Sequence, residues 1–310
     1  MKVRLLTSIF LLFGTVALAS GQTGTPQPTP VSTPQPTPQP TPIQTVSMLD
    51  RMKMRRDAAA QMSPAEQARY RNMIAARYID PIYRKPTRDE LVAVAVDPTI
   101  TAKYAAFLDT PNTGVFKLVR DNGCDQKTSV VSATDVCRTY SMPGAGNSFS
   151  FRTGNYRLRR LGDLSSRDSS FFVPGVFMHG ILTVLGDIDP GGIGLESPGV
   201  ASLAALSPAT STAKATEFGA TIARGFQKDG HRLSAMVKMK VNTTYALRSI
   251  AYRGKVMRAV VGATYNEMER DKRRDVIVVF RVVDLDADGT ATIIWRELRN
   301  TESPELKNEK

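Results

Sequence analysis

The chain has 310 residues, and its 41 lysines and arginines outnumber its 29 aspartates and glutamates, so the formal net charge is +12. This balance favours attraction to anionic envelope polymers and surfaces. Beyond the first residues, no stretch approaches the roughly 18 consecutive apolar residues of a membrane helix, so we expect no integral span after that segment is removed.

The first 19 residues have the pattern of an export signal. Lys2 and Arg4 make a basic start, Leu5–Val16 is apolar, and Ala17–Ala19 has the small-x-small pattern of a cleavage site. We therefore expect cleavage after Ala19 and a periplasmic or extracellular protein. An uncleaved anchor is the alternative.

Residues 20–46 are rich in proline, threonine and glutamine. Within Thr25–Pro42 roughly every second residue is proline, which removes backbone donors and fixes φ. The segment is expected to be a polyproline II-like spacer that holds the folded part away from a surface. A disordered tail without a tethering role is the alternative.

Residues 47–111 are predicted to be helical because they contain three helix start signals. Ser63 precedes a proline and is followed three residues later by Glu66, which is a capping box. Thr87 and Glu90 make a second box, and Asp97 precedes another proline.

The first predicted helix, Ser47–Tyr78, is basic and rich in methionine. Such a helix could lie on a membrane surface or bind a partner. The alternative is a packed helix that turns a solvated, charged face outward.

Residues 112–301 show the period-two alternation of strands, so we predict an α+β protein: a small N-terminal helical region followed by a mostly antiparallel β-sheet domain. The apolar stretch Ser170–Glu196 is expected to lie in the core. Asp275–Asp284 and Gly289–Arg299 form the clearest hairpin. His231–Val241 and Thr244–Tyr252 are expected to pair as strands. Glu217–Phe226 is ambiguous between helix and strand.

Other strands are expected at Gly114–Asp121, Ser148–Arg152, Asn155–Leu161 and Lys255–Ala263, with a short helix at Ser197–Leu206. Residues 302–310 are polar and are expected to be a disordered tail.

Cys124 and Cys137 are the only cysteines of the chain. In an exported protein an even, close pair indicates one disulfide. Two free buried thiols are the alternative. A metal site is disfavoured, since two thiols without neighbouring histidines leave the coordination incomplete.

Asp284, Asp286 and Asp288 precede Gly289 at alternate positions, as in the first half of an EF-hand calcium loop. Trp295 stands where the closing glutamate should be, and strand-like residues flank the motif. We favour a hairpin turn in which Gly289 adopts positive φ. A calcium site on the three carboxylates is the alternative, and we expect no other cofactor.

The two histidines, His179 and His231, are the candidates for catalytic residues. His179 lies in the apolar stretch and could be a general base, but a buried histidine bonded to the backbone is the favoured interpretation. His231 fits a turn at a strand start. The chain contains none of the motifs GxSxG, HExxH, GxxxxGK[ST] and GxGxxG.

Arg152, Arg157, Arg159 and Arg160 alternate with aromatic residues and are candidates for binding an acidic glycan or another anionic polymer. Alternation on a strand would place Arg157 and Arg159 on one face. A one-sided solvated sheet requires the same pattern, and we favour that interpretation. We do not expect nucleic acid as a partner.

The leading hypothesis is an exported protein with a non-enzymatic binding or scaffolding role at the cell envelope or outside the cell. Its bases are the signal, the proline-rich segment, the basic charge and the missing catalytic motifs. The alternative is an exported hydrolase with an unfamiliar site that uses His179 or His231 together with nearby carboxylates.

Overall fold

The computed structural model describes residues 62–92, 94–120 and 146–307, together with 47, 49–51, 53, 54 and 57. The chain divides into two compact units, Met1–Ser47 and Met48–Lys310, and the second carries the helices and strands described below. The helical region and the sheet region therefore belong to one unit. The expected signal, the proline-rich segment and both cysteines lie outside the described residues.

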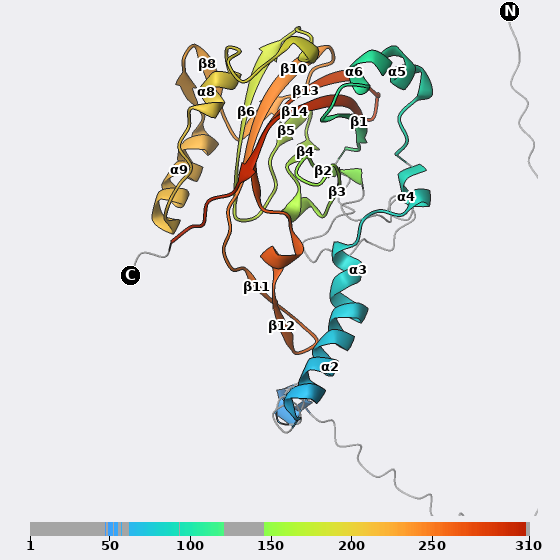
Figure 1. Cartoon of the computed structure of the whole chain (residues 1–310), viewed down its shortest axis with the longest axis vertical. Coiled ribbons are helices and arrows are strands. Elements are labelled where there is room, and N and C mark those ends of the chain that lie inside the picture. The colour runs from blue at the N-terminus through green and yellow to red at the C-terminus, as the bar shows by residue number, and fades with distance from the viewer. Residues whose placement is uncertain are drawn as a thin grey trace, which may run out of the picture. The chain divides into compact units, whose positions relative to one another are not determined.

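The predicted fold class is confirmed: short helices precede two mostly antiparallel sheets, so the protein is α+β (Figure 1). All three helix start signals act as caps. The Glu66 amide donates to Ser63 Oγ at 3.3 Å, and the Glu66 carboxylate accepts from the Ser63 amide at 2.8 Å. The helices are α2 (Pro64–Ile74), its π-helical extension η1 (Ala75–Ile79), α3 (Asp80–Tyr83), α4 (Arg88–Val92), α5 (Pro98–Lys103) and α6 (Ala105–Leu108).

A five-stranded antiparallel sheet forms the centre of this unit, in the order β1-β14-β13-β10-β6. The predicted C-terminal hairpin is confirmed as β13 and β14, and its turn contains Gly289 at φ +90°. The strands of the sheet are β1 (Thr113–Leu118), β6 (Met178–Gly186), β10 (Thr243–Ala251), β13 (Arg274–Leu285) and β14 (Ala291–Glu302).

A second, smaller sheet has the order β3-β2-β4-β5-β9, and two separate hairpins pair β7 with β8 and β11 with β12. The expected pairing of His231–Val241 with Thr244–Tyr252 is wrong, because β10 pairs with β6 and β13 instead. The strands are β2 (Ser148–Ser150), β3 (Asn155–Tyr156), β4 (Leu164–Arg167), β5 (Ser170–Phe172), β7 (Phe226–Lys228), β8 (His231–Leu233), β9 (Met236–Lys238), β11 (Met257–Val260) and β12 (Ala263–Asn266).

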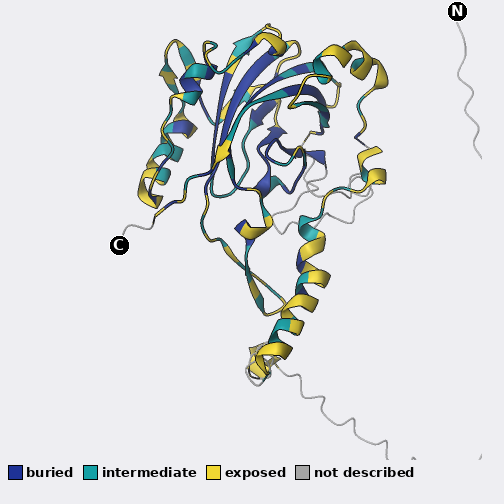
Figure 2. Ribbon diagram, in the orientation of Figure 1, coloured by how far each residue is buried: buried dark blue, intermediate teal, exposed yellow. Residues whose placement is uncertain are grey.

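The central sheet is buried on both faces (Figure 2). Towards the smaller sheet it contributes Phe280 and Trp295 to an aromatic core, which also contains Phe149 and Phe171 from the facing strands. Towards the other side its residues pack against α8 (Val200–Ala204) and α9 (Thr212–Arg224). The ambiguous stretch Glu217–Phe226 is thus mostly helix.

Ser170–Glu196 supplies β5, β6 and the short turn η4 (Pro190–Gly192). It contributes buried side chains to both cores, as expected, but β6 is an edge strand of the central sheet and not its middle.

Residues 302–307 were expected to be part of a disordered tail, but the structure shows them packed against the rest of the unit. Ser303 and Leu306 are buried, and Glu305 and Lys307 form bridges with Arg253 and Ser211. Among the described residues, none of the helices has the length and apolar character needed to span a membrane.

A candidate binding pocket

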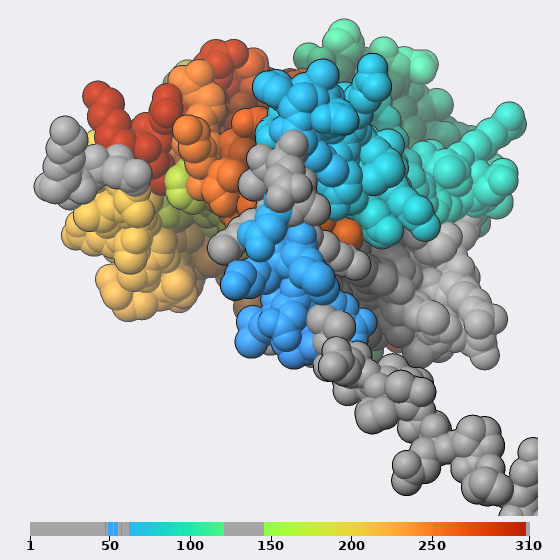
Figure 3. Space-filling view, turned by 90° about the horizontal axis from the view of Figure 1, so that it is seen from below, coloured from blue at the N-terminus to red at the C-terminus, as the bar shows by residue number. Residues whose placement is uncertain are grey.

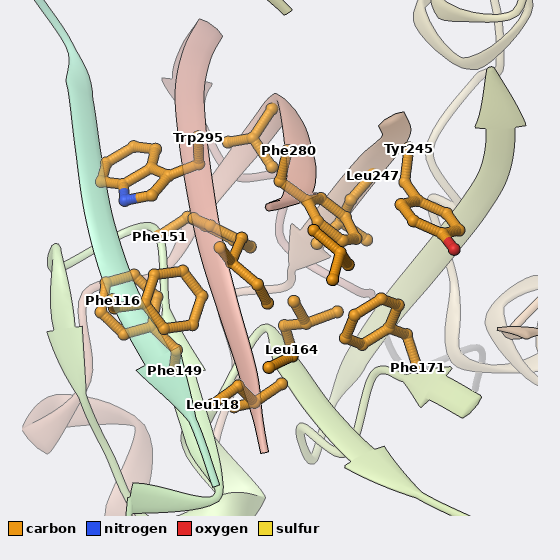
Figure 4. Close-up of a cluster of buried hydrophobic side chains, with 14 of the residues drawn as sticks. Phe116, Leu118, Phe149, Phe151, Leu164, Phe171, Tyr245, Leu247, Phe280 and Trp295 are labelled. Carbon is orange, nitrogen blue, oxygen red and sulfur yellow. The ribbon is translucent and has the colours of Figure 1, made fainter. Parts of the chain in front are cut away.

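Aromatic side chains at one end of the core form the wall of a pocket between the two sheets and the α4–α5 segment. Phe116 of β1 stacks on Phe149 of β2 with 3.8 Å between ring centroids, and Tyr156 meets Phe149 edge-on at 5.6 Å. The ring centroid of Trp295 in β14 lies 6.2 Å from that of Phe149. Figure 4 shows the indole above the stacked pair of phenylalanines.

The position of the indole depends on a glycine in the neighbouring strand. Gly114 is the register partner of Trp295 in the β1–β14 ladder. A Cβ atom at position 114 would lie 2.6 Å from Nε1 of Trp295, which is closer than unbonded atoms approach. Only glycine therefore lets the indole lie across the β1 backbone.

The pocket has a volume of about 650 Å³, which is within the usual range of small-molecule sites. Leu91, Val94 and Val96 also line it. The polar lining residues are Thr101, Thr113 and Asn155.

Hydrogen bonds to nearby backbone atoms already occupy most of these polar groups. Thr113 Oγ1 donates to the Thr110 carbonyl at 2.7 Å, and Asn155 Oδ1 accepts from the Tyr156 amide at 2.9 Å. The Tyr156 hydroxyl donates to the Lys117 carbonyl at 2.6 Å, and burial raises the pKa of this phenol.

The described lining residues include no carboxylate, imidazole, thiol, amine or guanidinium. Tyr156 is the one ionisable residue among them, and its hydroxyl faces a backbone carbonyl. This arrangement suits the binding of a neutral ligand by ring stacking and apolar contact, with Asn155 as a polar contact at the edge.

His179 lies on β6 with both ring nitrogens in hydrogen bonds. Nε2 is 2.9 Å from the Ala215 carbonyl, and Nδ1 is 2.9 Å from the Tyr252 hydroxyl. Because a carbonyl only accepts, Nε2 carries the proton and Nδ1 accepts from Tyr252. Burial lowers the pKa of the imidazole. The ring thus links β6 to α9. This agrees with the favoured interpretation from the sequence, a buried histidine bonded to the backbone.

His231 begins β8 and is partly exposed beside the β7–β8 turn. Asp229 and Gly230 of this turn both have positive φ. The residue therefore stands at the start of a strand, directly after a turn, as the sequence suggested. His179 and His231 lie on different strands, and neither lines the aromatic pocket.

The four candidate arginines do not form an exposed binding surface. Arg152 is almost fully buried, with Nε 2.8 Å from Asp163 and Nη1 2.6 Å from Asp271. Arg157 is also buried and donates to two backbone carbonyls, those of Tyr83 and Arg270.

The other two arginines lie in a short turn. Arg160 pairs with the buried Glu267 at 2.6 Å, and Arg159 begins the 3-10 turn η3, Arg159–Leu161. The expected strand Asn155–Leu161 ends at Tyr156, so the assumed alternation of faces does not hold. The expected solvated face of arginines is therefore absent: Arg152 and Arg157 are buried, and Arg159 and Arg160 are only partly exposed.

The three aspartates of the calcium-like motif belong to the β13–β14 turn and its flank. The Asp286 amide donates to the Thr290 carbonyl at 2.9 Å, and Asp288 Oδ1 accepts from the Thr290 amide at 2.8 Å. Asp284 is paired with Thr292 in the ladder. Within the described part of the chain, no three histidine, cysteine or acidic side chains are arranged to hold a metal ion.

Sequence reasoning missed the residues that build the pocket and the ion pairs. Gly114 and Trp295 become partners only through the pairing of the first and last strands. Asp163 and Asp271 meet Arg152 from different parts of the chain. Alternation within β1 and β14 indicated strands, but it did not indicate which strands would be neighbours.

The chain matches no protein-family model, no curated protein and no solved structure. The α+β fold and the pocket are therefore the basis for the proposals that follow.

Proposed function

We propose that this is an exported, non-enzymatic binding protein whose aromatic pocket takes a small neutral ligand with an apolar or ring-shaped surface. The observation that carries the proposal is the pocket of about 650 Å³ walled by Trp295, Phe149 and Tyr156. Export is expected from the first 19 residues of the sequence.

The chemistry of the pocket favours binding over turnover. Acid–base catalysis needs a titratable group within hydrogen-bond reach of the substrate, and the described lining supplies only the bonded phenol of Tyr156. The aromatic rings of the wall are held rigidly in the core, so they can make apolar contacts with little further loss of conformational entropy. A neutral ligand also avoids the cost of placing a charge in an apolar site.

Trp295 makes the proposal directly testable because it is the one tryptophan of the chain. We would titrate the protein that begins at Ser20 with N-phenyl-1-naphthylamine, a neutral, apolar fluorescent dye. Binding in the pocket should produce energy transfer from the indole to the dye. Dye bound elsewhere on the surface would give a weak signal that does not saturate.

A variant that fills the pocket tests whether the dye binds there. Ala95→Phe places a ring in the pocket at an exposed lining residue and should weaken dye binding strongly. Ala106→Phe is the matched control, since this exposed alanine of α6 does not line the pocket. Equal dye affinity in both variants, or no saturable transfer at all, would count against the pocket.

The non-enzymatic part of the proposal has its own test. The same protein would be offered ester, peptide, glycoside and phosphate substrates. Turnover that a single substitution such as His179→Gln removes, in a folded protein, would show an enzyme and overturn the proposed role.

A further inference from the structure

The β11–β12 hairpin and the helix α2 with its extension η1 expose large apolar side chains. Met73 of α2 is 53% exposed, and Met257 of β11 is 60% exposed. Tyr78 of η1 and Val261 at the hairpin tip are also exposed. We call the surface formed by Pro64–Ile79 and Lys255–Asn266 the α2–hairpin face.

The two parts of this face are connected through α3. The hydroxyls of Tyr83 and Tyr265 are 2.9 Å apart, and Arg270, just beyond the hairpin, pairs with Asp80 at 2.7 Å. Figure 3, seen from below, shows the blue helix segment and orange residues of the hairpin region side by side. The face is therefore one surface made from two distant parts of the sequence.

Its charge is strongly unbalanced. Pro64–Ile79 contains Arg69, Arg71 and Arg77, all exposed, against the single acid Glu66. Glu66 is bound to Ser63 in the cap of α2. The guanidinium of Arg77 lies 5.4 Å from the ring centroid of Tyr78, so cation and apolar surface are adjacent.

The hairpin continues the same pattern. Lys255–Asn266 contains Lys255 and Arg258 but no aspartate or glutamate. Its exposed apolar residues, Met257 and Val261, thus share the hairpin with two cations, and the nearest exposed carboxylate in the sequence is Glu269, which accepts from the Asn266 amide at 3.3 Å at the base of the hairpin.

The hairpin tip is conformationally strained. Val261 and Gly262 connect the strands with φ values of +47° and +79°. Two-residue turns with positive φ favour asparagine and glycine, and a β-branched residue in this region is an outlier. The strain places an isopropyl group, 38% exposed, at the outermost turn. Backbone outliers of this kind cluster where a chain makes functional contacts, so the tip is a candidate contact site.

We propose that the α2–hairpin face binds the surface of an anionic lipid bilayer. Met73, Met257 and Val261 enter the boundary between headgroups and acyl chains, while the arginines and Lys255 lie against the lipid phosphates. Apolar side chains surrounded by cations are what such interfacial binding requires. Tyr78 has the amphipathic ring that is enriched at this depth.

The charge pattern favours lipid over a protein as the occupant. A bilayer presents negative charge on all sides of an inserted tip, and the face has cations on both of its parts. The inference is independent of the aromatic pocket, because no residue of the face lines it.

Vesicle flotation tests the proposal with the chain that begins at Ser20. One set of vesicles contains phosphatidylcholine alone, and the other contains equal parts of phosphatidylcholine and phosphatidylglycerol. The protein should float with the second set and much less with the first. Binding should weaken as salt is raised, since the attraction is partly electrostatic.

Val261→Asn separates lipid binding from folding. Asparagine suits positive φ, so the melting temperature should stay constant or rise. Loss of the valine should weaken vesicle binding by up to about tenfold. Val241→Asn is the matched control, because Val241 is 47% exposed and lies in a different turn. It should leave vesicle binding unchanged.

A separate variant tests the contribution of the positive charges. Replacing Arg69 and Arg258 by glutamine should weaken binding to the anionic vesicles by about fivefold for each charge. Val241→Asn and the pocket variant Ala95→Phe should bind these vesicles as the unchanged protein does.

Three results would overturn the lipid assignment. The first is no binding to anionic vesicles. The second is binding that Val261→Asn and the arginine variants leave intact, which would place the contact elsewhere on the chain. The third is concentration-dependent dimerisation without vesicle binding, abolished by Val261→Asn, which would assign the face to a second copy of this chain.

Discussion

Gly114 and Trp295 face each other across the β1–β14 ladder, and the indole occupies the space that a side chain at position 114 would need. Gly114→Ala brings a methyl group to 2.6 Å from Nε1 and forces the ring to move. We expect a loss of about 1–3 kcal/mol in the free energy of unfolding, as for other overpacked sites.

Urea denaturation followed by Trp295 fluorescence measures this loss, and dye binding should fall with it. Gly194→Ala is the control, because its Cβ would meet no atom within 4 Å. Equal stability of the two variants would show that the indole does not need Gly114.

Arg152 holds the most deeply buried charge network in the described part of the chain. Asp163 also accepts from Ser150 Oγ at 2.8 Å and from Ser249 Oγ at 2.5 Å, so it lies between two sheets. Arg152→Met removes the cation that pairs with the buried Asp163, while Asp271 keeps its ion pair with Arg273 at 2.8 Å. Breaking a buried pair in this way costs about 3–5 kcal/mol.

The control for Arg152→Met is Arg274→Gln, which removes a partner of the exposed Glu302. Exposed pairs contribute about 0–1 kcal/mol, so chemical denaturation should distinguish the two variants clearly. Similar losses in both would mean that burial does not set the strength of these pairs.

His179 is expected to make the free energy of unfolding depend on pH. Burial lowers its pKa in the folded protein below the unfolded value of about 6.5. Below pH ~6.5 the unfolded chain therefore takes up the proton first, and stability falls as the pH drops towards the folded pKa. The contribution is fully present above that window.

His179→Gln tests this dependence. The amide can still donate to the Ala215 carbonyl, but the bond with Tyr252 is lost, at a cost of about 1–3 kcal/mol near neutral pH. The fall in stability below pH ~6.5 should become shallower. His231→Gln is the control, and the hypothesis fails if it flattens the profile as much.

Asp288 stabilises the β13–β14 turn by accepting from the Thr290 amide and, at 3.2 Å, from the Thr290 hydroxyl. Asp288→Ala should lower the free energy of unfolding by about 1 kcal/mol. The loss should be the same with added calcium and with a chelator. If calcium raised the melting temperature of the unchanged protein but not that of the variant, the turn would be a calcium site.

The sequence patterns were reliable where both partners of a contact lie close together in the chain. The capping boxes and the β13–β14 hairpin depend on residues a few positions apart, or on one turn, and all were confirmed. The buried state of His179 followed from its apolar neighbours in the same stretch.

The patterns were unreliable where a contact joins distant segments. Alternation identified β10 as a strand but paired it with the wrong neighbour, because pairing is decided by which buried faces fit together. The arginine-rich stretch looked exposed because its balancing acids, Asp163, Asp271 and Glu267, are not recognisable as partners in the sequence.

The position of β14 has a consequence for how the chain folds. It pairs with β1, the first strand, on one side and with β13 on the other. Until the last strand has left the ribosome, β1 has no partner in the sheet and β13 lacks half of its ladder. The β6–β10–β13 part of the sheet can pair earlier, but the five-stranded sheet is completed only after β14 has been synthesised, so its last step joins the two ends of the described sheet region through contacts of high sequence separation.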